Sequence, residues 1–114
     1  MARRAIYKVE RWGAAERDLE AIFDFLVESY LRFGDHIERA RTQGIKKDLR
    51  DLGKAPHQGT RHDNWLPGLR HVTKDRVIYY FTVDDEQQVV RVLAVFFGGQ
   101  DHQRRMLRRL MSRD

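Results

Sequence analysis

The order of its sequence patterns predicts that this chain folds as one α+β domain spanning residues 1–114. A strand-like stretch comes first, two helix-like stretches follow, and three strand-like stretches and a last helix-like stretch complete the chain. The length of 114 residues suits a single hydrophobic core. Helices that are grouped apart from closely linked strands favour a two-layer α+β architecture, in which the helices pack on an antiparallel sheet.

The first half of the chain predicts a strand and a helical hairpin. Residues 4–12 alternate between apolar and polar side chains, which is typical of a strand. From Ala14 the apolar residues recur at helical spacing, and Gly34 suits the end of that helix. A second amphipathic stretch ends near Gly53. The short link between the two helices predicts that they run antiparallel as a hairpin.

The second half predicts a loop, three strands and a helix. Residues 54–68 hold both prolines and no periodicity, so we expect a long loop. Strands are expected over 69–74, 76–83 and 88–97, and their short polar links predict a three-stranded antiparallel meander. Helical spacing returns over residues 100–113, which predicts a C-terminal helix.

The matched periodicities of helices and strands predict one core between the hairpin and the sheet. Tyr79 and Tyr80 are consecutive residues of a strand and face opposite sides, so we expect only one of them in this core. The expected core residues are apolar and lie at helical or alternating spacing: Leu19, Ile22, Phe23, Leu26, Ile45, Leu49, Val77, Tyr79, Phe81, Val92 and Ala94.

Composition excludes several classes of protein. The chain has no cysteine, which rules out a disulfide framework and a thiolate nucleophile or metal ligand. Its longest apolar run, 92–97, is far shorter than a membrane span, and the N-terminus lacks the apolar segment of a signal peptide. We therefore expect a cytoplasmic protein without membrane contact. His57, His62 and Asp63 lack a regular ligand spacing, so we expect no metal and no cofactor.

The charge of the chain is basic and uneven. The formal net charge is +5, and arginine supplies 17 of the 22 cationic side chains. Residues 13–33 sum to −3, whereas residues 101–114 sum to +3. Arginine makes bidentate contacts with phosphate and carboxylate groups, so an anionic partner is one interpretation. The other interpretation is that the charges only keep the protein surface well solvated.

Three short motifs carry a resemblance to a known family. Leu69-Arg70, 76–80 (Arg-Val-Ile-Tyr-Tyr) and 92–95 (Val-Leu-Ala-Val) occur in the order found in the RelE/ParE superfamily of bacterial toxins, which this chain resembles over nearly its whole length. The run Gly98-Gly99-Gln100-Asp101-His102 is similar to the turn before the last helix in ParE-like and plasmid-stabilisation members. The resemblance implies a hairpin against a curved sheet. It also implies a type II toxin that a cognate acidic antitoxin neutralises within a hetero-oligomer.

The resemblance leaves two activities open, because RelE-like members cut mRNA on the ribosome and ParE-like members inhibit DNA gyrase. A RelE-type site implies an arginine opening a central strand, a second arginine after the last strand and a tyrosine in the last helix. Arg76 matches the first, and Arg70 could assist it. The second arginine is absent, and Met106 stands where the tyrosine is expected. His102 could replace a missing acid or base, since histidine titrates near neutral pH.

Simpler interpretations exist for these residues. Arg76 could have a structural role and pair with acidic residues of the neighbouring turns. His102 could likewise be a structural residue that begins a helix beside Asp101. Arg91 lies inside an apolar strand, so we expect it to pair with an acidic side chain of a helix. The Met/Leu stripe of the last helix is most simply explained by core packing.

The favoured hypothesis is therefore a ParE-like toxin that binds DNA gyrase and performs no chemistry of its own. Its expected target-binding residues are Arg105, Arg108 and Arg109, and its expected antitoxin-binding residues are Arg91, Met106 and Leu110. The alternative is a RelE/HigB-like, ribosome-dependent mRNA endonuclease with Arg70, Arg76 and His102 as catalytic residues. A third possibility is a non-toxic interaction module of the same fold.

Overall fold

A five-stranded sheet forms the centre of the molecule in the computed structural model, which describes residues 5–34, 36–98 and 101–112. The strands lie in the order β1-β5-β4-β3-β2; β1 runs parallel to β5, and the other neighbours are antiparallel. None of the helices within these ranges is both long and apolar enough to cross a membrane. The elements in chain order are β1 (Lys8–Arg11), α1 (Gly13–Phe33), α2 (His36–Lys54), β2 (Thr60–Arg61), β3 (Arg70–Lys74), β4 (Val77–Asp84), β5 (Val89–Phe97) and α3 (His102–Met111).

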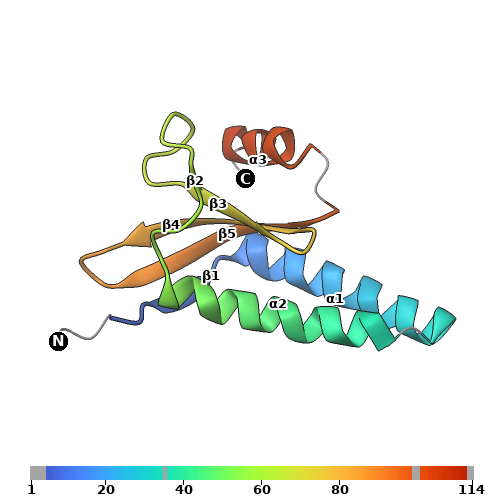
Figure 1. The fold of residues 1–114 in the computed structure, drawn as a ribbon. Helices are drawn as coiled ribbons and strands as arrows, with labels where there is room; N and C mark the ends of the chain where they lie inside the picture. Colours follow the sequence, from blue (N-terminus) through green and yellow to red (C-terminus); the bar gives the residue numbers. More distant parts are fainter. Residues whose placement is uncertain (1–4, 35, 99–100, 113–114) are drawn as a thin grey trace.

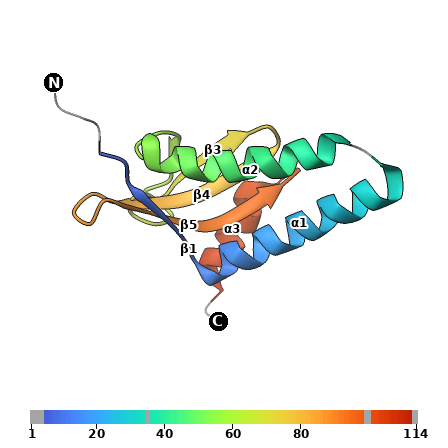
Figure 2. The same cartoon turned by 90° about the horizontal axis from the view of Figure 1, so that it is seen from below.

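Helices cover both faces of the sheet. Figure 1 shows α1 and α2 on one face and α3 on the opposite face. Figure 2, seen from below, shows the two antiparallel helices of the hairpin in front of the sheet and α3 behind it. The predicted α+β class, hairpin, meander and C-terminal helix are confirmed, but the two-layer arrangement is wrong. Most residues of β4 and β5 are buried, and strands that are apolar on both faces need cover on both sides.

The two layers of packing create two hydrophobic clusters instead of one. The cluster beneath the hairpin holds the expected helix residues together with Val77, Tyr79, Phe81 and Val92, and Phe23 packs against it. The cluster beneath α3 holds Leu69, Ile78, Tyr80, Leu93, Ala94, Phe96 and Met106. Both tyrosines are fully buried, one in each cluster. Only Tyr79 lies in the core beneath the hairpin, as expected, and Tyr80 is buried because α3 covers the other face.

A β-bulge places Ala94 in the second cluster. Tyr80 pairs with Ala94 and Phe81 pairs with Val92, so Leu93 is one extra residue in β5. A bulge breaks the alternation of a strand, and Leu93 and Ala94 therefore face the same side. The expectation that Val92 and Ala94 share one face assumed a regular strand and is wrong for Ala94.

The predicted loop 54–68 contains a short strand. Thr60 and Arg61 of β2 pair antiparallel with His71 and Arg70 of β3. Gly59 precedes this strand with a φ of 94°, and a Cβ atom there would lie 2.4 Å from the carbonyl oxygen of His71. Two residues are too few to show an alternating apolar and polar pattern, so the sequence could not predict β2. Its pairing depends on β3 and on the close approach of Gly59 to the His71 carbonyl oxygen.

The helical hairpin ends close to the predicted positions. Gly34 adopts a left-handed conformation with a φ of 62°, and its N–H donates to the carbonyl oxygen of Tyr30 at 2.7 Å. Gly53 lies inside the last turn of α2 rather than after it. The Tyr7 N–H donates to the Gly53 carbonyl oxygen at 2.8 Å, so the chain before β1 runs directly against this glycine.

Gly53→Ala is expected to lower the free energy of unfolding by about 1–3 kcal/mol, although alanine normally favours a helix. The added Cβ atom would lie 2.2 Å from the Tyr7 carbonyl oxygen and 3.1 Å from Val9 Cγ2. Gly44→Ala in the same helix is the matched control, because no atom lies within 4 Å of its added Cβ. Urea denaturation should show a stabilisation of up to about 1 kcal/mol for Gly44→Ala. A stabilised Gly53→Ala variant would contradict the close contact.

Candidate functional site

The structure does not bring the three candidate nuclease residues together. Arg70 shares its face of β3 with Val72 of the hairpin-side cluster, and its Nη1 donates to the His57 carbonyl oxygen at 2.9 Å. Arg76 lies in the turn before β4, at a φ of 70°, and its guanidinium covers the ring of Phe97 at 5.9 Å. Phe97 also packs against the hairpin-side cluster, whereas His102 lies on the side of α3.

The expected pairing of Arg76 with a turn acid is not found. Within the described ranges, its guanidinium forms no ion pair with Asp75, Asp84 or Glu86. Asp84 instead pairs with Arg91. The turn position of Arg76 also differs from the prediction, in which it opened the strand 76–83.

His102 belongs to a cluster of rings between α3 and the sheet. The histidine cluster consists of His62, Trp65, His71, Tyr80 and His102. The Tyr80 hydroxyl lies 2.9 Å from Nδ1 of His102, and Nε2 of His62 lies 2.5 Å from Nδ1 of His71. Trp65 stacks on His62 with ring centroids 4.2 Å apart, and the rings of His71 and His102 meet edge to face at 5.0 Å.

Burial keeps the histidine cluster uncharged near neutral pH. Desolvation, followed by the neighbouring imidazoles of His62 and His102, lowers the pKa of His71 to about 4. Desolvation also lowers the pKa of His62 and of His102. Burial raises the pKa of Tyr80 to about 12. Neutral imidazoles can pass a proton between them, but the two candidate arginines contact other groups, Arg70 the His57 carbonyl oxygen and Arg76 the ring of Phe97.

The sequence analysis named His102 as a candidate but missed Tyr80 as its partner. The contact joins residues 22 positions apart on different elements, and the local pattern carries no sign of it. No group of three or more His, Cys, Asp or Glu side chains in the described part of the chain is arranged to hold a metal ion.

The arginines of α3 have different environments. Arg109 makes two contacts with the Asp18 carboxylate of α1, from Nη1 at 2.6 Å and from Nη2 at 3.1 Å. Arg105 covers the ring of Phe96 at 4.5 Å while remaining exposed, and Arg108 is also exposed. Arg109 therefore fastens α3 to α1, whereas the side chains of Arg105 and Arg108 remain exposed.

The three expected antitoxin contacts are largely occupied within the fold. Met106 is 1% exposed in the cluster beneath α3, and Leu110 is partly buried against that cluster. Arg91 pairs with Glu10 of β1 at 3.6 Å and with Asp84 of β4 at 3.3 Å. The expectation that Arg91 pairs with an acid of a helix is wrong, because its strand neighbours supply the carboxylates.

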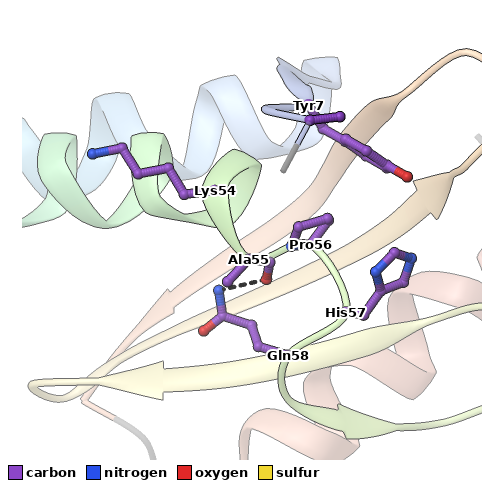
Figure 3. Close-up of a pocket in the computed structure, with 7 residues that line it drawn as sticks. Tyr7, Lys54, Ala55, Pro56, His57 and Gln58 are labelled. Carbon is purple, nitrogen blue, oxygen red and sulfur yellow. Dashed lines mark hydrogen bonds between the residues drawn. The ribbon is translucent and has the colours of Figure 1, made fainter. Parts of the chain in front are cut away.

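A separate hollow of about 380 Å³ lies where the N-terminal segment meets the loop after α2. Figure 3 shows Tyr7 and His57 on its walls, with Lys54, Pro56 and Gln58 beside them. The Tyr7 hydroxyl donates to Asp85 at 2.8 Å, and His57 Nε2 lies 2.7 Å from the same carboxylate oxygen. The hydrogen bonds from Tyr7 and His57 lower the pKa of Asp85. These exposed contacts tie the β4–β5 turn to the N-terminal segment.

Comparison with known proteins gives matches among solved structures only. No protein-family model matches the chain, and no curated protein matches it either. A chain of the chromosomal ParDE toxin–antitoxin system from P. aeruginosa is similar, with a TM-score of 0.60 and 20% identity over 81% of this chain and 96% of that one. A chain of the RelBE2 toxin–antitoxin complex from Mycobacterium tuberculosis has a TM-score of 0.55 and 20% identity, over 85% and 97%.

The isolated E. coli RelE toxin is also similar, with a TM-score of 0.54 and 14% identity over 93% of this chain and 99% of that one. The aligned part therefore includes most of the hairpin and the sheet. At this level of identity the likeness establishes the architecture. The chain has the fold of the RelE and ParE toxins, as the order of its sequence motifs predicted.

Proposed function

We propose that the chain is the toxin of a type II toxin–antitoxin module and that a cognate acidic antitoxin neutralises it in a hetero-oligomer. The shared fold supports this proposal, because the similar structures include ParDE and RelBE2 toxin–antitoxin assemblies. The basic net charge of +5 supports an acidic partner.

We further propose that the toxin acts by binding DNA gyrase, as the resemblance to ParE-like members implies. The separation of Arg70 and Arg76 from His102 is the observation that favours gyrase binding over mRNA cleavage. Phosphodiester cleavage needs cations at the phosphate beside a proton acceptor and a proton donor, and these candidates do not converge. Binding needs only exposed complementary groups, which Arg105 and Arg108 supply on a helix that Arg109 holds in place.

The test compares gyrase supercoiling with mRNA cleavage on translating ribosomes. The purified protein is expected to inhibit supercoiling and to leave mRNA intact. Arg105→Glu combined with Arg108→Glu should weaken inhibition by at least about tenfold, because contact charges of the target-binding face are reversed. His102→Gln is the control and should inhibit like the unaltered protein. Codon-positioned mRNA cuts without gyrase inhibition would overturn the gyrase proposal.

The histidine cluster favours one second candidate, an mRNA endonuclease that uses His62, His71 and His102 rather than the arginines. Three adjacent imidazoles and the Tyr80 hydroxyl offer proton acceptors and a proton donor. On this alternative, His71→Gln abolishes ribosomal mRNA cleavage while Arg76→Ala retains it. Antitoxin binding without either activity would identify the non-toxic interaction module.

A further inference from the structure

An apolar hollow lies between α1, the end of β5 and α3, and two further arginines pack on the ring of Phe97 beside it. We call it the Phe97 surface, formed by Phe25, Arg41, Arg76, Phe97 and Arg105. The rings of Phe25 and Phe97 lie 6.1 Å apart, and both line a hollow of about 240 Å³ together with Arg105. Phe25 is 56% exposed although it is a large aromatic residue. The tip of the hairpin extends beyond the end of β5 in both ribbon views (Figures 1 and 2).

Two arginines from different elements pack on the ring of Phe97. The Cζ atoms of Arg41, from α2, and of Arg76 lie 5.7 and 5.9 Å from the centroid of Phe97. Nε of Arg41 is moreover buried without a hydrogen-bond partner, which is costly for a charged donor. The unpartnered Nε points to an acceptor, such as a carboxylate, that the described residues do not provide.

The neighbouring carboxylates do not neutralise these arginines. Asp18 lines the hollow, but its carboxylate is bound by Arg109. Asp48 lines an adjacent hollow with Arg41, but it accepts the hydroxyl hydrogen of Tyr79 and forms no ion pair with Arg41. Within the described ranges, Arg41, Arg76 and Arg105 take part in no ion pair. The Phe97 surface thus combines an apolar floor with three unpaired cations.

We propose that the Phe97 surface binds an acidic amphipathic segment of the antitoxin. This proposal rests on the proposed function, in which the chain is a toxin with an antitoxin partner. One apolar side chain of the segment enters the hollow between Phe25 and Phe97. Its carboxylates pair with Arg41, Arg76 and Arg105, and one of them satisfies the buried Nε of Arg41. Because Arg105 also belongs to the proposed target-binding face, the bound segment covers that face. Neutralisation then follows from occlusion rather than from unfolding of the toxin.

The binding test uses the full chain and a short fluorescent helical peptide with leucine on one face and glutamate on the other. Fluorescence anisotropy should detect saturable binding that weakens in high salt. Arg76→Glu and Arg41→Glu should each weaken binding by about tenfold or more, since each reverses a contact charge. Arg50→Glu is the matched control, because Arg50 lies on α2 beside a different hollow. Equal binding of a peptide with lysine in place of glutamate would overturn the proposal, as would full binding by Arg76→Glu.

A second measurement separates this proposal from the proposed function. The product of the reading frame next to the gene is co-expressed with the unaltered chain, the Phe25→Ser variant and the Arg50→Glu control. Co-purification with all but Phe25→Ser is the expected result. Equal co-purification with every variant would keep the antitoxin and reject the Phe97 surface. Peptide binding without any co-purifying neighbour would keep the surface as an acidic-peptide site and reject the antitoxin. Self-association that Phe25→Ser abolishes would assign the surface to a second copy instead.

Discussion

Asp18→Ala is expected to lower the free energy of unfolding by about 2–4 kcal/mol and to loosen α3. The Asp18 carboxylate is only 16% exposed and accepts three hydrogen bonds, two from Arg109 and one from the Val95 N–H at 2.9 Å. β1 pairs with β5 only as far as Val92. Beyond that point the Asp18 carboxylate accepts the hydrogen bond of the Val95 N–H in place of a neighbouring strand. Its removal leaves a guanidinium and a backbone N–H without their acceptor.

Asp24→Ala is the matched control, because Asp24 lies exposed on the same helix and should change stability by less than about 0.5 kcal/mol. A double-mutant cycle with Arg109→Ala measures the coupling between the two side chains. Chemical denaturation gives the stabilities, and proteolysis within 101–112 reports the release of α3. A coupling energy near zero would mean that the contact does not hold α3 in place.

Acidification from pH 7 to pH 5 is expected to destabilise the fold by about 1–2 kcal/mol through His71 alone. Burial holds the pKa of His71 at about 4 in the folded chain, against 6.5 for an ordinary histidine. Between pH 4 and pH 6.5, His71 binds a proton in the unfolded chain but stays neutral in the folded chain. Stability is therefore greatest above pH 6.5 and falls as the pH drops toward 4. The lowered pKa values of His62 and His102 act in the same direction.

Urea denaturation at pH 7 and pH 5 checks this expectation. His71→Gln should reduce the difference between the two pH values, because glutamine does not titrate. His57→Gln is the control, since His57 is exposed and pairs with Asp85 outside the histidine cluster. The carboxylates of Asp63 and Asp84, whose pKa values are lowered, stay ionised in this range and contribute little. An unchanged pH dependence in His71→Gln would show that the histidine cluster is not the source.

The helices and the main strands could be predicted because their signals are local. Spacing of apolar residues marked α1 and α2, and the run of β-formers marked β4 and β5. Gly34 ended α1 where its left-handed conformation was expected. The motif order from Leu69 to Val95 predicted the toxin fold, which the solved structures confirm.

Tertiary structure alone decided how these elements combine into layers and surfaces. The bulge at Leu93 moved Ala94 to the other face, and the cover of both faces by helices buried both tyrosines. Asp18 meets Arg109 across 91 positions, and Arg41 and Arg76 come from different elements to contact the ring of Phe97. Spacing along a chain reports which residues share one helix face or one strand face. Contacts between elements depend on register, crossing and burial, which arise only when the whole domain packs.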